Sequence, residues 1–285
     1  IANFYFQILT FNKIKAASIG TLGVNGLKVN KKFLNTTFDS IQINKILEKL
    51  KKKKIENVIL EASSHGLNQN RLDGLEFDIG IFTNLTRDHL DYHKTFKNYF
   101  NSKLILFKKL LKKKSYAIYD NDLKISSDLN KITRLNKIKK LTLGNTKSNF
   151  AIIDHQFLKD EQKITFRYDK RQYSFSTKLI GRVQIKNLLM AMMAAMKSKI
   201  SLEKILKVTQ NIKPIDGRLE KIGSLYNNGI VILDYAHTPD ALKTCIKNVK
   251  EQFKFRKINL VFGCGGERDK PKRKIMGKIA NKYCD

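Results

Sequence analysis

Short apolar runs alternate with longer amphipathic segments through the first 212 residues, and this alternation limits the fold more than any other feature. In one run, residues 57–60, Val58, Ile59 and Leu60 follow one another without polar alternation, as in parallel strands buried on both faces. The other strand candidates are residues 16–19, 77–82 and 116–119. Helices are expected between them, at residues 40–53 and 95–111. The pattern predicts βαβ units and a mostly parallel sheet in an α/β fold.

The rest of this region adds two helices and an antiparallel part of the sheet. Residues 1–14 have helical spacing, with Phe4, Ile8, Leu9 and Phe11 on one apolar face. Residues 151–179 alternate in the manner of half-buried strands, which favours antiparallel pairing. The segment 181–198 is an apolar helix rich in Ala and Met, and we expect its methionines to pack in the core.

A second α/β unit begins near residue 215, so we predict one domain over 1–214 and another over 215–285. The second unit is expected to contain a strand at 230–233, a helix at 239–253, a strand at 258–262 and a helix from about 271. Gly263, Gly265 and Gly266 lie between the last strand and helix, where glycines let a phosphate approach the backbone. Tight strand-to-helix turns also need glycine for their geometry, so the motif alone is weak.

The composition is strongly basic, with 56 Lys and Arg against 25 Asp and Glu and a formal net charge of +31. Such a charge leaves a nucleic-acid-binding α/β protein as an alternative. The excess is mainly lysine, it accompanies many Ile and Asn residues with AT-rich codons, and aromatic residues are not interleaved with it as on a base-stacking surface. The three cysteines are too widely spaced to indicate a disulfide framework or a zinc site. The absence of a signal-like or membrane-spanning apolar run makes the cytoplasm the default location.

The stretch LEASSHGLNQNRLDG at 60–74 follows a predicted strand and gathers Glu61, Ser63, His65 and Arg71. Glu61 would lie at the carboxyl end of that strand, where open α/β sheets place their ligands. A polar turn between two elements explains the same residues, so this stretch alone leaves both interpretations open.

Lys103 falls on the apolar side of the helix predicted at 95–111. Its ammonium could reach the edge of the stripe, or the amine could be desolvated, held neutral and available for chemistry. Just upstream, the segment RDHLDYH contains His89 and other His and Asp residues after a predicted strand. These residues suit a Mg²⁺ site, although Asp and His are also frequent helix caps.

Eight ordered segments resemble the ATP-dependent Mur ligases of peptidoglycan synthesis, and within them the branch that adds diaminopimelate. They are IGTLGV, NTTFDSIQINKIL, EASSHGLNQNRLDG, FTNLTRDHLDYHKTFKNYFNSKLILF, NLLMAMMAAM, DGRLEKI, LDYAHTPDALK and VFGCGGERDKPKRKIMGKIA. The resemblance implies a central ATPase domain followed by the start of a Rossmann-like C-terminal domain. It also implies that meso-2,6-diaminopimelate is added to UDP-N-acetylmuramoyl-L-alanyl-D-glutamate through an acyl phosphate. L-Lysine is the alternative amino acid. ATP is the implied co-substrate and Mg²⁺ the implied cofactor.

The same resemblance implies roles for individual residues. Glu61 matches a ligand of the Mg²⁺ that bridges the ATP phosphates, His89 matches a ligand of a second Mg²⁺, and Lys103 matches a lysine that is carbamylated to ligate it. The residues implied to hold the UDP-linked dipeptide are Thr36, Thr37, Ser63 and Arg71, and those implied around ATP are Asn187, Arg218, Asp234 and His237. Two positions depart from the family pattern, since Gln184 replaces an Asn and Phe38 replaces a Pro.

The ends of the chain lead us to expect a piece of a longer protein. The first helix has no cap before Ile1, and no terminating signal precedes Asp285. By resemblance, the uridine domain and phosphate loop would precede Ile1, and an Asp-Asn-Pro-Arg motif that selects the amino acid would follow Asp285. We therefore expect these 285 residues alone to be inactive. A folylpolyglutamate synthetase relative is a further alternative, against which the SSHGL and RDHLDYH segments argue.

Overall fold

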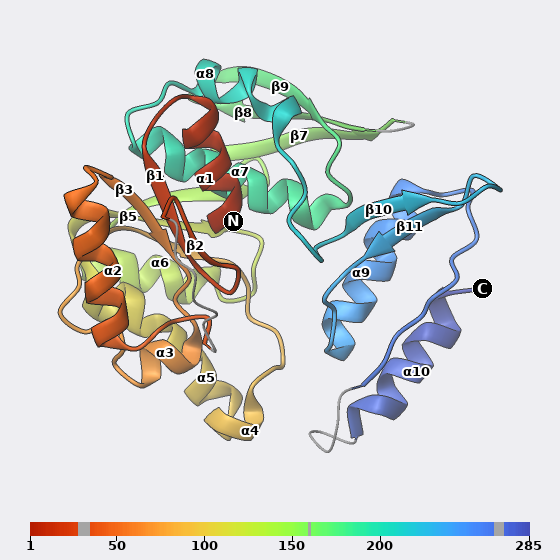
Figure 1. Ribbon diagram of the computed structural model, residues 1–285, viewed down its shortest axis with the longest axis horizontal. Helices are drawn as coiled ribbons and strands as arrows, with labels where there is room; N and C mark the ends of the chain where they lie inside the picture. The colour runs from red at the N-terminus through yellow and green to blue at the C-terminus, as the bar shows by residue number, and fades with distance from the viewer. Residues whose placement is uncertain (28–34, 159–160, 265–270) are drawn as a thin grey trace.

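A computed structural model describes the chain except for residues 28–34, 159–160 and 265–270. It shows an α/β protein with a large lobe that contains two sheets and a small C-terminal unit beside it (Figure 1). In the described residues, no helix is both long and apolar enough to cross a bilayer.

The first sheet has the strand order β2-β1-β3. Strands β1 (Ala16–Gly20) and β3 (Asn57–Leu60) are parallel, and β2 (Gly23–Asn25) is antiparallel to β1. Helix α1 (Ala2–Phe11) precedes β1, and α2 (Ser40–Lys52) connects to β3 and begins where the Asp39 side chain accepts a hydrogen bond from the Gln42 amide. The predicted apolar face of α1 is confirmed at Phe4, Ile8 and Leu9 but is wrong at Phe11, which is 40% exposed because it ends the helix.

The second sheet has six strands in sequence order, β4 to β9. Their bounds are β4 (Phe77–Phe82), β5 (Leu111–Asp120), β6 (Lys139–Gly144), β7 (Phe150–Phe157), β8 (Gln162–Tyr168) and β9 (Arg171–Thr177). Pairing is parallel from β4 to β7 and antiparallel from β7 to β9, which confirms the predicted parallel sheet and its antiparallel portion. The strands are nevertheless divided between two sheets, a division that hydrophobic periodicity does not encode.

Four further helices belong to the large lobe, and one is shorter than predicted. They are α3 (Ser64–Asn68), α4 (Leu90–His93), α5 (Phe96–Ile105) and α6 (Ser126–Leu135). The helix expected at 95–111 is capped by Thr95, but α5 ends at Ile105 and a π-helical turn, Leu106–Leu110, follows. Leu111 already belongs to β5, because it pairs with Phe77.

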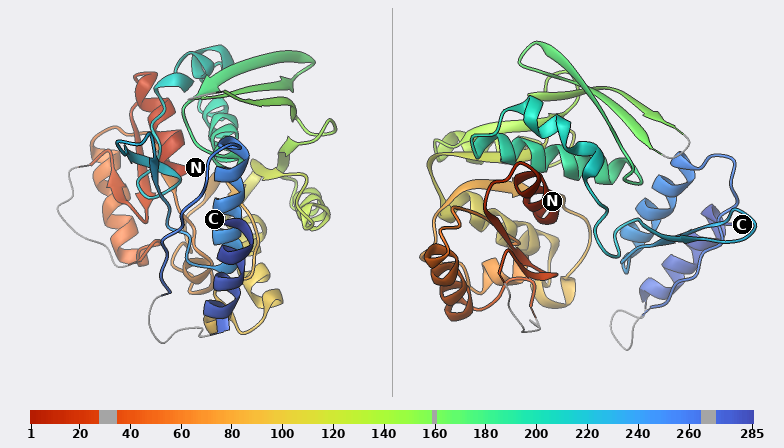
Figure 2. Two further views of the ribbon diagram at one scale, coloured as in Figure 1. Left: turned by 90° about the vertical axis from the view of Figure 1, so that its right-hand side faces the viewer. Right: turned by 45° about the horizontal axis from the view of Figure 1, so that its top comes forward.

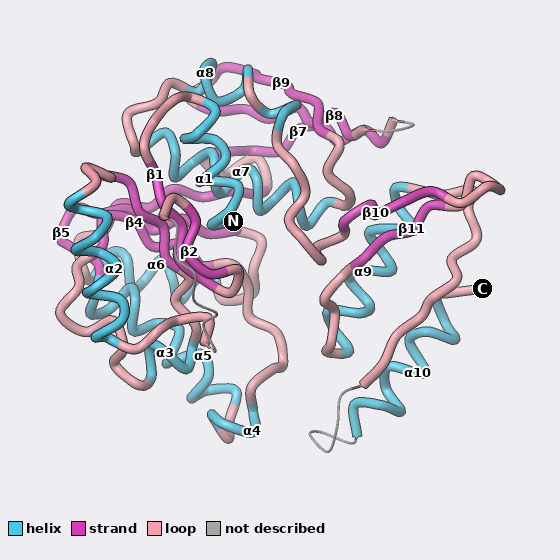
Figure 3. Tube along the Cα trace, in the orientation of Figure 1, coloured by secondary structure: helices cyan, strands magenta, loops and turns pink. Residues whose placement is uncertain are grey.

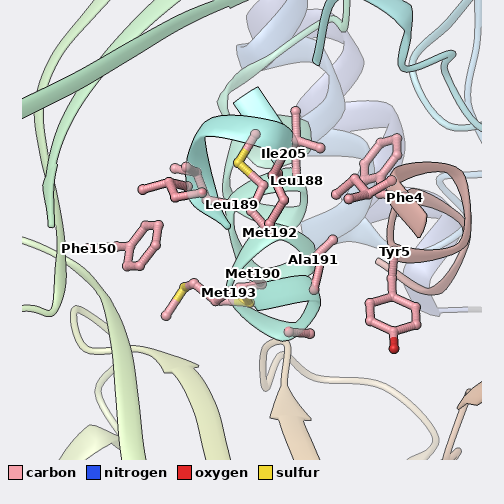
Figure 4. Close-up of a cluster of buried hydrophobic side chains, with 14 of the residues drawn as sticks. Phe4, Tyr5, Phe150, Leu188, Leu189, Met190, Ala191, Met192, Met193 and Ile205 are labelled. Atoms are coloured by element: carbon pink, nitrogen blue, oxygen red, sulfur yellow. The ribbon is translucent and has the colours of Figure 1, made fainter. Parts of the chain in front are cut away.

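Helix α7 (Arg182–Lys197) forms the centre of the main core (Figure 4). Its buried Met190, Met192 and Met193 pack among α1, Phe150 of β7 and α8 (Leu202–Lys207), so the predicted core role of the methionines is confirmed. A single 3₁₀ turn, Thr209–Asn211, follows α8. Because α7 is nearly surrounded, its sequence lacks a polar face.

The C-terminal unit consists of β10 (Glu220–Ser224), β11 (Ile230–Leu233), α9 (Pro239–Gln252) and α10 (Pro271–Tyr283). The strand predicted at 230–233 and the helices are confirmed, but β10 was not predicted and pairs antiparallel with β11. The strand expected at 258–262 does not form; this segment has no ladder partner in the described chain and runs as loop beside α10 (Figure 3). Ile258 and Leu260 still pack on α9 and α10, which explains their apolar alternation.

Helix α9 caps the beginning of α7 and thereby joins the unit to the large lobe (Figure 2). The Gly181 amide donates to Gln252 Oε1 at 2.8 Å, and the Val183 amide donates to Asn248 Oδ1 at 3.1 Å. These bonds satisfy amides that no residue of α7 itself can pair. Gly181 has φ of 82°, and a Cβ there would lie 2.7 Å from the Asn248 Cβ, so glycine permits both the turn and the close approach.

Candidate functional site

The carboxyl ends of β1 and β3 bring Glu61 and Thr21 together. Glu61 Oε2 accepts hydrogen bonds from the Thr21 amide and from Thr21 Oγ1, each at 2.8 Å. A Cβ at Gly20 would lie 2.6 Å from the Glu61 Cγ, so the glycine makes room for this carboxylate. Thr36 joins the group through a 3.1 Å contact between its Oγ1 and that of Thr21. The second carboxylate oxygen of Glu61 makes no hydrogen bond among the described residues and is available to a ligand.

Thr37, Ser63 and Arg71 form a connected group directly beside Glu61. Thr37 is 1% exposed, and its hydroxyl accepts the Ser63 amide at 2.8 Å and lies 2.7 Å from the Glu61 carbonyl oxygen. Ser63 caps α3 by accepting the Gly66 amide at 3.1 Å. Arg71 Nη1 donates to the Thr37 carbonyl oxygen at 2.6 Å. Four residues that the sequence assigned to one substrate, Thr36 included, are therefore brought to one place.

Lys103 lies partly buried over two aromatic rings. Its Nζ is 5.7 Å from the ring centre of Phe82 and 5.1 Å from that of Tyr99, and it donates to the Asn84 carbonyl oxygen at 3.1 Å. Burial lowers the pKa of Lys103 to about 8, and the Asp88 carboxylate opposes this shift. Of the two interpretations of this lysine, its burial favours the desolvated amine, while its chemical role remains a prediction.

His89 occupies the turn that leads into α4, with φ of 54°. Its amide donates to Asp88 Oδ1 at 2.8 Å, and its Nε2 lies 3.5 Å from Asp88 Oδ2. Its ring packs edge-on against His65, with ring centres 4.9 Å apart. His65, to which no role was assigned from the sequence, thus contacts a predicted metal ligand.

The described residues contain no preformed set of three or more His, Cys, Asp and Glu side chains around a metal position. Mg²⁺ needs only one or two protein carboxylates when phosphate oxygens and water complete its shell. The free oxygen of Glu61 at a strand end fits this requirement, and a carbamate on Lys103 would add a further carboxylate. The donors fit Mg²⁺ bound together with a phosphate-bearing substrate better than they fit a resident transition metal.

The four residues assigned to ATP lie at the junction of α7 and the C-terminal unit. Asn187 contacts Gln184 at 3.5 Å, and Gln184 Nε2 donates to the Arg218 carbonyl oxygen at 2.6 Å. The Arg218 guanidinium lies 4.8 Å from the ring centre of Tyr235.

Asp234 and His237 complete this group within one turn. Asp234 accepts the Leu219 and Ala236 amides, each at 2.9 Å, and burial raises the pKa of this carboxyl group while these amides oppose the shift. The His237 ring packs against Tyr235 at 5.0 Å. Of the glycine turn, Gly263 is exposed, and Gly265 and Gly266 lie outside the described residues.

The amino end of α1 connects the two halves of the site. Glu61 and Arg218 both lie close enough to Ile1, at this end of the helix, to interact with it electrostatically. Glu61 of the large lobe and Arg218 of the C-terminal unit therefore both lie near the amino end of α1. The amino end of a helix favours anions, so a phosphate between Glu61 and Arg218 would meet a favourable field once a cation accompanies it.

Sequence reasoning missed three contributors: Thr21, Gln184 as a bridge, and Tyr235 beneath Arg218. Thr21 follows a buried strand in the quoted segment IGTLGV, so its position at a strand end was a usable signal. Gln184 was noted as a departure from the family pattern, but no signal in the sequence identified Arg218, 34 residues away, as its partner.

Comparison with known proteins identifies the family of the chain. Residues 5–195 match the profile of the Mur ligase middle domain, and residues 217–285 match the Mur ligase, glutamate ligase domain. The chain belongs to the Mur ligase family. A curated relative from Rickettsia bellii, UDP-N-acetylmuramoyl-L-alanyl-D-glutamate--2,6-diaminopimelate ligase, is 38% identical over 292 residues that cover 100% of this chain and 60% of the relative. This Mur ligase chain thus spans about 60% of the length of that relative.

Solved structures show the same fold. A UDP-N-acetylmuramoyl-L-alanyl-D-glutamate--2,6-diaminopimelate ligase matches with a TM-score of 0.75 and 28% identity, over 100% of this chain and 58% of the other. A folylpolyglutamate synthase from Mycobacterium tuberculosis, solved with ADP and AMPPCP, matches with a TM-score of 0.70 and 13% identity, over 90% of this chain and 64% of the other. The second likeness shows a shared fold alone.

Proposed function

We propose that the protein carrying this chain is an ATP-dependent ligase that adds meso-2,6-diaminopimelate to UDP-N-acetylmuramoyl-L-alanyl-D-glutamate, in cytoplasmic synthesis of peptidoglycan precursors. The observation that supports it best is the contiguous group of Glu61, Thr37, Ser63 and Arg71, which places a cation-binding carboxylate next to a set of donors for an anionic substrate. The 38% identity to a relative of that name supports the choice of substrates. L-Lysine is the alternative amino acid.

The reaction needs two anions, the dipeptide carboxylate and the ATP γ-phosphate, to be brought together. Arg71 suits the carboxylate because a guanidinium offers several fixed donors, of which only one is used by Thr37. In this proposal, Ser63 and Thr37 would orient the same substrate, and Arg218 of the C-terminal unit would face the phosphates. Glu61, His89 and a carbamylated Lys103 would hold Mg²⁺, which when bound neutralises phosphate charge as the two anions approach.

Bond making and breaking follow from this placement. A carboxylate oxygen of the D-glutamate attacks the γ-phosphorus of ATP, the bond to the β-phosphate oxygen breaks, and ADP leaves. The amine of the incoming amino acid then attacks the acyl carbon of the acyl phosphate, loses a proton, and expels inorganic phosphate to leave an amide. In the proposed site, these residues position the reactants and stabilise charge, which dominates phosphoryl transfer.

The lowered pKa of Lys103 suits its proposed modification. A neutral amine can attack CO₂ to form an N–C bond and release one proton, whereas an ammonium cannot. With a pKa of about 8, a substantial fraction of this amine is neutral at physiological pH, unlike that of a solvent-exposed lysine. The product is a carboxylate on α5, the helix that follows α4 and the His89 turn.

Phosphate release from ATP tests the proposal. With purified protein carrying these residues, we expect release that requires both the UDP-linked dipeptide and diaminopimelate, and at least tenfold less with L-lysine. A Glu61→Gln variant should lose most of the rate, while Glu56→Gln, an exposed glutamate at the other end of β3, should not. Release that ignores the dipeptide would contradict the proposed reaction, and preference for L-lysine would select the alternative.

A further inference from the structure

His93 is a buried histidine that joins two helices of the proposed site. It ends α4 and is 4% exposed. Its Nε2 lies 3.0 Å from the hydroxyl of Ser64, which begins α3, and its Nδ1 lies 3.3 Å from the hydroxyl of Ser102 in α5. None of the assignments made above gives this residue a role.

The direction of each hydrogen bond follows from counting protons. The Ser102 hydroxyl donates its only proton to the Asn98 carbonyl oxygen at 2.8 Å, so it accepts from the imidazole Nδ1–H. Nε2 then carries no proton and accepts from the Ser64 hydroxyl. A neutral imidazole with its proton on Nδ1 satisfies the whole chain, in agreement with the burial that lowers the pKa of His93.

The two serines are direct neighbours of proposed site residues. Ser64 follows Ser63 of the dipeptide group, and Ser102 precedes Lys103. His93 therefore connects the backbone on which the dipeptide ligand sits to the backbone that carries the lysine. Among the described residues, no hydrogen bond or ion pair joins Glu61, Ser63 or Arg71 directly to Lys103, and this buried imidazole provides a polar connection between the two segments.

Aromatic packing keeps the imidazole in its place. The ring centres of Tyr99 in α5 and His65 in α3 each lie 5.3 Å from the His93 ring centre. Tyr92 adds a second link, because its hydroxyl donates to Asn68 Oδ1 at 3.0 Å. The ring is thus restrained from both helices, and the bonds to Ser64 and Ser102 set its orientation.

We propose that His93 is a positioning residue, which fixes the dipeptide-binding end of α3 and the Lys103 segment of α5 in one geometry. This proposal rests on the proposed function for its catalytic meaning, since it concerns the relative placement of the two reactant sites. The contact itself is independent of that function. The same group can therefore be tested by one structural and one kinetic measurement.

The structural test is amide hydrogen exchange in the purified protein. Ser64→Ala and His93→Asn each break the link to α3, and the asparagine amide can still donate to Ser102 from the position of Nδ1. We expect both variants to speed exchange at least threefold at residues 99–104 of α5 as well as in α3. Ser115→Ala is the matched control, because Ser115 is 5% exposed and its hydroxyl has no partner among the described residues.

The kinetic test is dipeptide-dependent phosphate release. Ser64→Ala and His93→Asn should each raise the dipeptide KM about fivefold to tenfold, as loss of one hydrogen bond allows, and should raise the Mg²⁺ concentration needed for half-maximal rate. The dipeptide KM of the double variant should not exceed that of either single variant, because the two substitutions remove the same link.

Exchange changes confined to α3, or additive kinetic effects, would overturn the positioning role. Wild-type protein without dipeptide-dependent phosphate release would instead overturn the proposed function, and the exchange measurement would still decide whether His93 couples the helices.

Discussion

The side-chain amide of Gln184 lies 2.6 Å from the carbonyl oxygen of Arg218, and this hydrogen bond joins the centre of the large lobe to the C-terminal unit. Gln184 is 4% exposed on α7, while Arg218 stands just before β10. The Gln184 side chain is long enough to bring its amide from α7 to the neighbouring unit.

Replacement of Gln184 by Met should weaken this junction. Met keeps the length and volume of the side chain but cannot donate, so we expect a loss of about 0.5–1.5 kcal/mol in the free energy of unfolding. The Kd of an ATP analogue should rise as well, because Arg218 loses its support. Urea unfolding and calorimetric titration of the purified protein measure the two effects.

The matched control for Gln184 is Gln172→Met on β9, where the glutamine is exposed and should tolerate the change. If both variants unfold at the same urea concentration as the wild type, the hydrogen bond does not stabilise the junction.

Lys103→Met should abolish activity and yet stabilise the fold near neutral pH. The folded pKa of about 8 lies below the ordinary 10.5, so the unfolded chain binds more protons between these values and stability rises with pH across that window. At pH 7 the buried Lys103 ammonium lowers the free energy of unfolding by its full desolvation penalty. Its removal should therefore raise that free energy by about 1–2 kcal/mol, after a discount for partial exposure. The gain should shrink by pH 10.

Urea unfolding at pH 7 and pH 10 checks this difference, with Lys97→Met as an exposed lysine of the same helix. A small carboxylic acid added to Lys103→Ala should restore part of the phosphate release, because it replaces the carbamate. A fully active Lys103→Ala protein would exclude the carbamate role.

The sequence predicted the elements that depend on local pattern and missed those that depend on distant partners. Periodicity located β3, β4 and α7, and the desolvated Lys103 was visible as a basic residue on an apolar stripe. Strand β10 was missed because its five residues contain Glu, Lys, Gly and Ser and pair only with β11. The segment 258–262 has a strand pattern but no ladder partner in the described chain, and periodicity cannot supply one.

The residues of the site divide in the same way, into those predictable from local sequence and those that depend on distant partners. Glu61 and Ser63 are close in sequence, so their proximity could be predicted from one turn. The bond from Arg71 to Thr37 spans 34 residues, and only the parallel pairing of β1 with β3, together with the packing of α3 on Thr37, brings them together. The resemblance to a family assigned these residues to one site without a physical reason for their proximity. The strand pairing and helix packing seen in the structure provide that reason.

His155 should make the fold sensitive to mild acid. Its Nε2 lies 2.6 Å from Gln162 Oε1 and its Nδ1 lies 3.0 Å from Arg182, which pairs with Glu251 of α9 at 2.6 Å. Burial lowers the pKa of His155, Arg182 adds to this shift, and the Gln162 bond, Glu251 and Asp154 oppose it.

The unfolded histidine therefore binds a proton at higher pH than the folded one, and stability falls as pH drops through about 6.5 toward the lower folded pKa. His155→Gln should reduce the loss of unfolding free energy between pH 7.5 and pH 5.5, as measured by urea unfolding. His237→Gln, at an exposed histidine, serves as the control for this pH interval. An identical pH dependence in His155→Gln and wild type would show that this histidine does not sense the acid.

Arg71→Lys should damage dipeptide binding more than folding. The lysine ammonium can still reach the Thr37 carbonyl oxygen, but it lacks the second, fixed set of donors that a guanidinium offers to a carboxylate. We expect the dipeptide KM to rise at least tenfold, the KM for ATP to change little, and the thermal midpoint to stay within a few degrees, since one carbonyl bond is retained.

Steady-state phosphate release at varied dipeptide and ATP measures the two constants, and Arg134→Lys at the exposed end of α6 provides the matched substitution. An unchanged dipeptide KM would show that Arg71 only holds Thr37 in place, and would move the carboxylate-binding role to another residue of the loop.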